Sequence, residues 1–333
     1  MKSVNAKVVR VLEWSGFGLG AAVVGLLGVC GAVVIAVSDT APMMFGNRTD
    51  VLATASADGP QFRFAVLGDT QKGTTGLRRM LAHLQPEGAA FYVHTGDLVS
   101  DNDGGHYRLA KWTLTRAKLD TPMLVAPGNH DVKGGTGLFE KHVGPMEVAW
   151  PRGAVRFLIV DDALGDPPPT HRLEKRLRAA GEAPIVLFMH QPPWDVTSES
   201  FRVTPGFEDV VALIRKYRVR YVFSGHVHRY RRLEQDGTVY VANGIGGDYE
   251  HWKLGTKVHA TVVEVNGRAI SDRPVELEPS HSVWDNIEHL ALGHVAETYR
   301  RSPIWTWAAT AAILAGWTWL VVRLWRRARK KTA

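Results

Sequence analysis

The sequence predicts an α/β body flanked by two apolar helices. Three observations carry this prediction. Short β-type runs alternate with helical stretches between residues 61 and 277, two uncharged apolar segments flank that region, and the length of 333 residues suits one large or two ordinary domains. The 45% hydrophobic and 22% charged residues are typical of a globular chain. The single cysteine, Cys30, excludes an intramolecular disulfide and a thiolate zinc site.

The net charge of +7 belongs to the two ends of the chain. Residues 1–14 hold +2 and residues 323–333 hold +6, so the residues between them sum to −1. A nucleic-acid-binding protein is expected to carry its positive charge on the folded body. The distribution therefore argues against a nucleic-acid partner.

Two uncharged apolar segments, Gly16–Val37 and Pro303–Val322, are predicted to be transmembrane helices. Their 22 and 20 residues match the roughly 20 residues that a helix needs to cross a bilayer. Basic residues precede the first segment and follow the second, which places both termini in the cytoplasm and residues 38–302 outside the cell (inner) membrane. As an alternative, the first segment is a secretory signal cleaved at Ala36–Ser38.

Within the body, predicted strands and helices alternate and are separated by turns rich in Gly, Pro, Asn and Asp. The predicted strands are 62–67, 89–94, 122–126, 156–160, 185–189, 219–223, 239–242, 259–265 and 270–277, the last three antiparallel. The predicted helices are 75–84, 107–118, 170–180 and 207–217. This alternation is typical of an α/β protein, whose ligand sites form where strands end.

The segments beside the body are predicted to be a tether and a juxtamembrane helix. In Ser282–Arg300, Ser282 and Asp285 fit a capping box. An apolar stripe, expected to pack on the body, comprises Val283, Trp284, Ile287, Leu290, Ala291 and Val295. The predicted order is a basic N-terminus, a span, a tether, the body, the juxtamembrane helix, a span and a basic tail, at residues 1–15, 16–37, 38–60, 61–280, 281–302, 303–322 and 323–333.

Nearly all plausible metal ligands follow five of the predicted strands. They lie in Gly68-Asp69-Thr70-Gln71, Gly96-Asp97, Gly128-Asn129-His130-Asp131, Met189-His190 and Gly225-His226-Val227-His228. A single Gly-Asp turn is explained by backbone geometry, and a lone His after a strand is usually structural. Five such segments in this order favour a metal site.

The five segments resemble the motifs of the calcineurin-like metallophosphoesterase family, which read D-x-H, G-D, G-N-H-[DE], a single H and G-H-x-H. The resemblance runs from Asp69 to His228, with flanking strands over residues 61–277. It implies a four-layer α/β/β/α sandwich, with two mixed sheets between helical layers and two metal ions at the sheet edge. Gln71 stands where the family usually has His.

The resemblance also implies a role for each residue. The implied ligands of the first metal are Asp69, Gln71, Asp97 and His228. The implied ligands of the second metal are Asp97, which would bridge the two, Asn129, His190 and His226. Nitrogen and oxygen ligands without thiolate suit manganese, iron or zinc. An amide oxygen from Gln71 in place of an imidazole would make the first site harder and looser.

His130 is implied to contact the substrate phosphate and to protonate the leaving oxygen, with Asp131 orienting its ring. The implied reaction is hydrolysis of a phosphate mono- or diester by attack of a metal-held hydroxide. Anchoring at both ends favours a membrane-associated substrate, such as a lipid-linked phosphoester. The alternative is a receptor or scaffold of the same fold with weak or no catalysis, which Gln71 alone favours. Mono- and diesters, and the oligomeric state, stay open.

Overall fold

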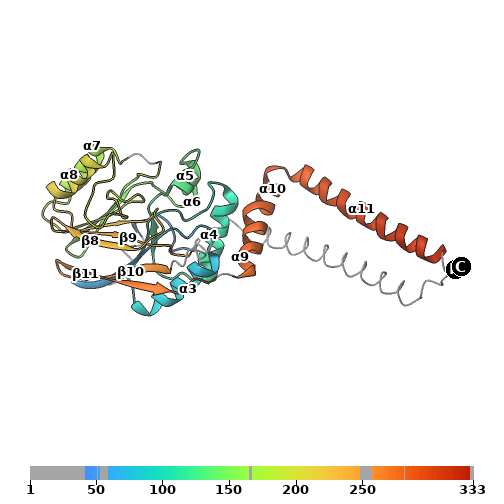
Figure 1. Ribbon diagram of the computed structural model, residues 1–333, viewed down its shortest axis with the longest axis horizontal. Coiled ribbons are helices and arrows are strands. Elements are labelled where there is room, and N and C mark those ends of the chain that lie inside the picture. The colour runs from blue at the N-terminus through green and yellow to red at the C-terminus, as the bar shows by residue number, and fades with distance from the viewer. Residues whose placement is uncertain are drawn as a thin grey trace. The chain divides into compact units, whose positions relative to one another are not determined.

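The computed structural model of the chain describes residues 42–50, 52, 59–164, 167–247, 257–280 and 282–330. These residues fall into two compact units, which divide between His289 and Leu290. The unit that ends at His289 contains both β-sheets and all the predicted ligand residues (Figure 1). The first predicted span and Cys30 lie outside the described residues.

The first sheet is mixed and has five strands. Their spatial order is β11 (Ala269–Leu277), β10 (Val258–Asn266), β1 (Gln61–Leu67), β2 (Tyr92–His94) and β3 (Met123–Val125). β2 pairs in parallel with both β1 and β3, whereas β10 is antiparallel to β1 and β11. The three parallel strands therefore end side by side, just before the segments that contain Asp69, Asp97 and Asn129.

The second sheet is also mixed and has six strands. Their order is β4 (Val148–Arg152), β5 (Val155–Ile159), β6 (Ile185–Phe188), β7 (Tyr221–Ser224), β9 (Thr238–Ala242) and β8 (Arg231–Gln235). The four inner strands pair in parallel, and β4 and β8 pair antiparallel at the two edges. The sequence does not predict β4 and β8, because Pro151 interrupts one and polar residues dominate the other. Edge strands tolerate both features.

Helices cover the outer faces of the sheets. In chain order they are α3 (Thr74–Leu84), the 3-10 turn η1 (Gln85–Glu87), α4 (Gly104–Arg116), α5 (Asn129–Val132), α6 (Gly137–His142), α7 (Thr170–Ala179) and α8 (Glu208–Lys216). The C-terminal helices are α9 (Val283–Glu288), the π-helical η3 (His289–Val295), α10 (Ala296–Arg301) and α11 (Pro303–Lys330).

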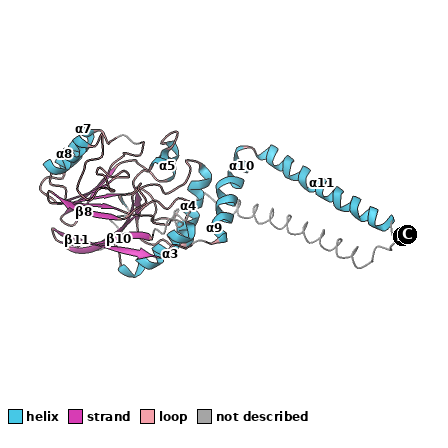
Figure 2. Ribbon diagram, in the orientation of Figure 1, coloured by secondary structure: helices cyan, strands magenta, loops and turns pink. Residues whose placement is uncertain are grey.

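Alternation along the strands separates three hydrophobic cores. In β1, Phe64 and Val66 point into a core shared by the two sheets, whereas Ala65 and Leu67 point into a core shared with α3 and α4. On the far side of the second sheet, Leu187 of β6 packs in a third core with α7 and α8. Figure 2 shows the resulting order of layers, from α7 and α8 through the two sheets to α3. The four-layer sandwich implied by the resemblance is therefore confirmed.

The core between the sheets is built largely of aromatic rings. Trp150 and Phe157 stack at 5.3 Å between ring centroids, and Phe188 and Phe223 stack at 5.6 Å. Phe64 meets Phe157 edge-on at 5.4 Å. Such pairs stabilise a fold by about 0.5–1.5 kcal/mol each beyond the burial of area. The rings fix the two sheets against each other.

Residues 42–47 pack on the body, so the tether predicted for residues 38–60 is wrong for this part. Phe45 forms a β-bridge with Met123. The buried Asn47 side chain donates to the Val125 carbonyl oxygen at 2.8 Å and accepts from the Val125 N–H at 2.8 Å. The sequence does not predict this packing, because these residues contact the edge of β3 through an isolated β-bridge and one side-chain amide and not through a regular strand.

The C-terminal end of the body begins as the sequence predicts. Ser282 caps α9, and Asp285 completes the capping box. The apolar stripe, however, is buried only in part, because Ala291 is 9% exposed whereas its first two residues are open to solvent. Val283 is 72% exposed and Trp284 is 65% exposed. The expectation that the stripe packs on the body therefore fails for Val283 and Trp284.

Polar contacts attach α9 to α3 instead. The buried Asp285 carboxylate accepts from the Thr74 hydroxyl at 2.5 Å and from the Thr75 N–H at 2.8 Å. Glu288 binds Arg78 at 3.1 Å. Because Thr74 and Thr75 begin α3, the helix dipole favours a carboxylate at this position.

The second predicted span lies within α11, which runs as one helix from Pro303 to Lys330. No helix in the described part of the chain, α11 included, is both long and apolar enough to cross a membrane. The structure therefore does not support the predicted span at 303–322. Several apolar side chains of α11 are exposed, among them Ile304, Trp305 and Ile313.

Candidate metal centre

The predicted ligands lie at the carboxyl ends of five strands from both sheets. Asp69, Asp97 and Asn129 follow β1, β2 and β3, and His190 and His226 follow β6 and β7. The structure brings these strand ends together. The His226 N–H donates to the Asp69 carboxylate at 3.0 Å, and the Asn129 Oδ1 lies 2.9 Å from His190 Nε2. All seven predicted ligands therefore belong to one cluster of polar side chains at the sheet edges.

Five of the seven predicted ligands have a left-handed backbone. Their φ angles are 51° at Asp69, 37° at Gln71, 55° at Asp97, 69° at His226 and 52° at His228. Such angles are uncommon for residues other than glycine and cost of order 1–3 kcal/mol each. They turn the chain back at the strand ends, so that residues two positions apart can face the same centre. Strain of this kind persists chiefly at functional sites.

Asp69, Asp97 and His228 form the first ligand group. Each offers one ligand atom, and these atoms lie within 4.8 Å of one another. His228 Nε2 lies 3.3 Å from Asp69 Oδ1. Gln71 joins this group through its amide, because Nε2 donates to Asp97 Oδ2 at 3.3 Å. The four residues implied for the first metal are thus brought together.

Asp97, His190 and His226 form the second ligand group, again with ligand atoms within 4.8 Å of one another. Asn129 joins them, because its Oδ1 lies 2.9 Å from His190 Nε2 and 3.0 Å from His226 Nδ1. The two imidazole nitrogens are 3.2 Å apart. Asp97 is common to both groups, the position expected of a bridging carboxylate.

The donor atoms around His190 fit a cation. Nδ1 lies 2.9 Å from the Thr95 carbonyl oxygen, so Nδ1 carries the proton and Nε2 presents a lone pair. Nε2 faces Asn129 Oδ1 at 2.9 Å and Asp97 Oδ1 at 3.4 Å. Three acceptors therefore face one another, an arrangement that a bound metal ion would satisfy. Nitrogen and oxygen donors without sulfur suit manganese, iron or zinc.

The electrostatics of the second group also favour a cation. Burial lowers the pKa of His190, but the nearby carboxylates, first Asp97 and then Asp69 and Asp162, outweigh burial and raise it overall. The negative potential that favours a proton on this ring equally favours a metal ion. Burial and the neighbouring His190 lower the pKa of His226. A lowered pKa keeps the imidazole neutral, as metal binding requires.

Asp131 does not orient His130, so that prediction is wrong. The Asp131 carboxylate accepts from the Val99 N–H at 3.0 Å and from the Gly128 N–H at 2.9 Å. Asp131 follows His130 on the helical turn α5, where adjacent side chains point roughly 100° apart. Burial and the charge of Asp97 raise the pKa of Asp131 to about 7. Asp131 thus links the loop after β2 to the loop after β3.

The partner of the His130 ring is a backbone carbonyl. His130 Nδ1 lies 2.7 Å from the Ser100 carbonyl oxygen and donates to it. The His130 N–H donates to Asp97 Oδ1 at 2.9 Å. These contacts leave Nε2 as the nitrogen that can exchange a proton with a substrate. The sequence carries no sign of this partner, because any residue supplies a carbonyl.

Glycines allow the ligand loops to approach the carboxylates closely. A Cβ atom on Gly225 would lie 2.5 Å from Asp69 Oδ2. A Cβ atom on Gly128 would collide with the backbone nitrogen and the carboxylate of Asp97. The motif glycines at these two positions are therefore required by close packing.

His94 is hydrogen-bonded to residues that are adjacent in the chain to two members of the first ligand group. It is fully buried, and burial lowers its pKa to about 3, so the ring is neutral. Nδ1 accepts from the Gly96 N–H at 3.2 Å, and Nε2 donates to the Thr70 hydroxyl at 3.0 Å. Thr70 and Gly96 are neighbours of Asp69 and Asp97. His94 thus has a structural role.

Asp162 also belongs to this region, although the sequence motifs do not include it. Asp162 is 2% exposed and follows β5, and burial raises its pKa to about 7. Its carboxylate accepts from the backbone N–H groups of His190 and Gln191. The available signal was its position, because Asp161 and Asp162 end a predicted strand as the ligands do.

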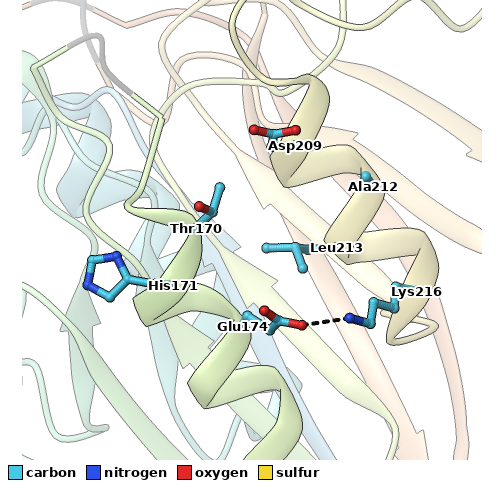
Figure 3. Close-up of a pocket in the computed structure, with 7 residues that line it drawn as sticks. All are labelled: Thr170, His171, Glu174, Asp209, Ala212, Leu213 and Lys216. Atoms are coloured by element: carbon cyan, nitrogen blue, oxygen red, sulfur yellow. Dashed lines mark hydrogen bonds and ion pairs between the residues drawn. The ribbon is translucent and has the colours of Figure 1, made fainter.

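A shallow groove of about 320 Å³ lies between α7 and α8 (Figure 3). Glu174 of α7 and Lys216 of α8 pair there at 2.7 Å. None of the predicted ligands lines this groove. The groove is therefore separate from the candidate metal centre.

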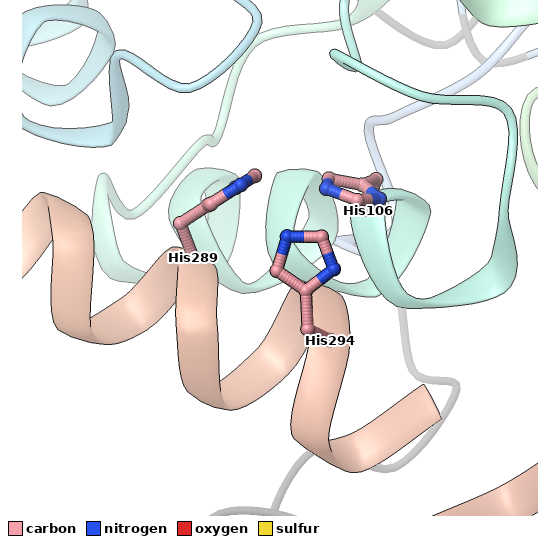
Figure 4. Close-up of side chains that lie close together, drawn as sticks. All are labelled: His106, His289 and His294. Atoms are coloured by element: carbon pink, nitrogen blue, oxygen red, sulfur yellow. The ribbon is translucent and has the colours of Figure 1, made fainter. Parts of the chain in front are cut away.

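A pair of histidines outside the candidate metal centre belongs to the packing around α4. The ring centroids of His106 and His289 are 4.9 Å apart, with the rings tilted by 50° (Figure 4). His106 is 2% exposed, and its Nδ1 lies 2.9 Å from the carboxylate of Asp103, which caps α4. Neither histidine is among the predicted ligands.

The family model for calcineurin-like phosphoesterases matches residues 62–230. This range is half of the chain and contains all five ligand segments. The chain therefore belongs to the calcineurin-like phosphoesterase family, as the motif resemblance predicts.

Similarity to solved structures is low. The purple acid phosphatase PPD1 from yellow lupin (Lupinus luteus) seeds is 18% identical, with a TM-score of 0.49, over 69% of this chain and 55% of the lupin chain. GAP50, the anchor in the inner membrane complex of Plasmodium, is 15% identical, with a TM-score of 0.49, over 70% and 95%. A dimetal phosphatase from Danio rerio is 14% identical, with a TM-score of 0.45, over 65% and 98%. The chain thus spans about half the length of the lupin protein. No curated protein matches the sequence.

Proposed function

We propose that the chain is a dinuclear metal-dependent phosphoesterase that hydrolyses phosphate mono- or diesters. The observation that carries this proposal is the position of Asp97. Its carboxylate belongs both to the group with Asp69 and His228 and to the group with His190 and His226. One carboxylate has two oxygens and can hold two metal ions at once, as two-metal phosphatases require. Family membership supports the same class of reaction.

The donor atoms assign the ligands of the two ions. The first ion would be held by Asp69, Gln71, Asp97 and His228. The second would be held by Asp97, Asn129, His190 and His226. When bound, manganese, iron or zinc ions would supply Lewis-acid polarisation of the phosphoryl oxygens and would acidify water.

His130 acts as the general acid in this proposal. The Ser100 carbonyl oxygen holds its Nδ1, and Asp97 holds its backbone N–H. A protonated ring can therefore donate from Nε2 to the leaving oxygen as the P–O bond breaks. General acid help from a positioned histidine contributes about 10²–10⁴-fold to the rate.

The exposure of the cluster gives the side from which the substrate approaches. Asp69, Asp97 and His190 are buried, whereas His130 is half-buried and His226 is exposed. The phosphoryl group would therefore meet the His226 and His130 side of the centre, with the carboxylates beneath it.

Location at the cell (inner) membrane forms a second part of the proposal. The uncharged segments Gly16–Val37 and Pro303–Val322 and the placement of basic residues support it. Exposed apolar side chains on α11 support it as well, because such side chains favour an apolar surrounding. In this proposal both termini are cytoplasmic, the catalytic body is extracytoplasmic, and the phosphoester substrate is membrane-associated or lipid-linked.

Metal analysis and a phosphate-release assay on the purified full chain test the catalytic proposal. We expect two metal ions per chain after loading with Mn²⁺, and turnover of an aryl phosphate mono- or diester. The assay extends to lipid phosphates, nucleotides and sugar phosphates. Metal-loaded protein that hydrolyses none of them would support the scaffold alternative, which the substitution of His by Gln71 favours.

Reporter fusions test the proposed location. Reporters that are active only in the cytoplasm should be active at either terminus, and a reporter inserted at an exposed loop of the body should be inactive. Extraction of membranes with alkaline carbonate should leave the chain in the pellet. A chain recovered in the soluble fraction contradicts the membrane proposal and leaves the catalytic proposal intact.

A further inference from the structure

A buried carboxylate that the proposed reaction does not use lies beneath the second ligand group. Asp162 is 2% exposed and comes three residues after β5. Its Oδ1 accepts from the His190 N–H at 2.8 Å, and its Oδ2 accepts from the Gln191 N–H at 2.7 Å. The Gln191 side chain donates back to the Asp162 carbonyl oxygen at 3.0 Å. These three bonds join the end of β5 to the end of β6.

The geometry favours a carboxylate at this position. Two consecutive N–H groups point at one side chain, and a carboxylate offers two acceptor oxygens where an asparagine offers one. Because both oxygens of Asp162 accept backbone N–H groups, the residue itself is not placed to bind a metal. Its two hydrogen bonds instead fix the start of the turn that contains His190.

His190 is held at two points besides its ligating atom. Asp162 holds its backbone N–H, and the Thr95 carbonyl oxygen holds ring Nδ1 at 2.9 Å. The remaining ring nitrogen, Nε2, faces Asn129 and Asp97. The backbone contact fixes the main-chain position of His190, and the Nδ1 contact fixes the rotation of its imidazole ring. Together they determine the position of Nε2.

We propose that Asp162 is a positioning residue for the second metal of the centre, acting through His190. This inference rests on the proposed dinuclear function, because it assigns a role toward one of the two ions. Partners that orient a metal-binding histidine typically change metal affinity by about 10–100-fold when they are removed. The hydrogen bonds of Asp162 described above go to His190 and Gln191, neither of which belongs to the first ligand group, so its removal should affect one site selectively.

The test is a Mn²⁺ titration of the metal-free full chain by calorimetry, combined with electron paramagnetic resonance of the loaded protein. For Asp162→Asn we expect one of two binding events to weaken at least about tenfold, while the other changes less than about threefold. The spectrum at limiting Mn²⁺ should change from that of a coupled pair toward that of a single ion. Asp161→Asn, which removes the adjacent carboxylate, should change neither event.

Gln191→Ala provides a second, milder variant. It removes the bond to the Asp162 carbonyl oxygen, and we expect the same binding event to weaken by a smaller factor. If Asp162→Asn does not fold, Gln191→Ala decides the question. Unchanged binding in the folded variants, or equal weakening of both events, overturns the role of Asp162. Wild-type protein that binds fewer than two Mn²⁺ ions instead contradicts the proposed function itself.

Discussion

The two ligand groups of the candidate metal centre differ in how firmly they are held. In the second group, the fully buried His190 has its backbone N–H and its Nδ1 fixed by Asp162 and the Thr95 carbonyl oxygen. Asn129 Oδ1 lies within 3.0 Å of a nitrogen of both His190 and His226. The donor atoms of this group are therefore oriented by a surrounding layer of hydrogen bonds.

The first group differs at one of its ligands, Gln71. His228 Nε2 lies 3.3 Å from Oδ1 of another proposed ligand, Asp69. Gln71 presents its Nε2 to Asp97, so the amide must turn to offer its oxygen to a metal. An amide oxygen also binds borderline metals more weakly than an imidazole does. The comparison shows that one centre can combine two kinds of metal site. In one, hydrogen bonds orient the ligands; in the other, an amide oxygen is a harder and weaker ligand than an imidazole.

The largest effect is expected at the residue that both groups share. Asp97→Asn removes the bridging carboxylate charge and should abolish tight binding of both ions. Loss of several kcal/mol of transition-state stabilisation corresponds to a fall in kcat/KM of about 10⁴-fold. Metal content and turnover of an aryl phosphate measure it, with Asp120→Asn as an exposed control. Retention of two metals and full turnover would remove Asp97 from the centre.

The second-largest effect is expected at His130, where a substitution should change catalysis without changing metal binding. His130→Ala should retain both metals and lose turnover by about 10²–10⁴-fold, because the general acid is missing while the ligand groups are intact. Substrates with acidic leaving groups should suffer less, since they need less protonation. His171→Ala, at an exposed position on α7, is the control. Full activity of His130→Ala would exclude His130 from the mechanism.

Gln71→His sharpens the comparison between the two groups. An imidazole in place of the amide should tighten the looser site for Zn²⁺ or Mn²⁺ by about tenfold and leave the other unchanged. Calorimetric titration measures both events in the same protein. If affinity and metal preference stay the same, Gln71 is not a ligand.

The smallest effect concerns stability and pH in the metal-free protein. Burial raises the pKa of both Asp131 and Asp162 to about 7 in the folded state, against an unfolded value of about 3.9. A raised folded pKa gives stability that is present below the unfolded pKa and is lost as pH rises through about 7. The neutral, buried His94 acts in the opposite direction, so we expect the Tm of metal-free Asp162→Asn to rise relative to that of the wild-type chain between pH 5 and pH 8, as thermal unfolding measures.

Two further comparisons check the origin of this difference. The exposed control Asp120→Asn should follow the wild-type chain over the same pH range. Added Mn²⁺ should raise Tm most at the higher pH, because the ligand imidazoles and carboxylates bind a metal ion only when they are deprotonated. A Tm difference between Asp162→Asn and the wild-type chain that is constant over this range, or that falls with pH, contradicts the burial of Asp162.

The sequence predicts which polar side chains lie together at the strand ends, because their signal is local. Each of Asp69, Asp97 and Asn129 stands at the end of a strand whose hydrophobic run is visible, and the glycines beside them mark tight turns. The fold brings strand ends together, so residues with these local signals meet. The aromatic core follows the same logic, since Phe62 and Phe64 alternate on one face of β1.

The sequence does not predict the residues whose partners are backbone atoms. Ser100 holds His130 through its carbonyl oxygen, and Asp162 holds His190 through an N–H, and neither contact has a side-chain signature. Asp131 was misassigned because adjacency along the chain was taken as adjacency in space. Val283 was misplaced because an apolar stripe does not say what it packs against, and Asp285 attaches that helix instead.

Anomalous diffraction from crystals of the Mn²⁺-loaded full chain tests the central claim most directly. We expect two anomalous peaks about 3.5–4 Å apart, with the Asp97 carboxylate between them and His190 bound to the peak that Asn129 also contacts. A single peak, or peaks beyond the reach of Asp97, would contradict the two-metal account.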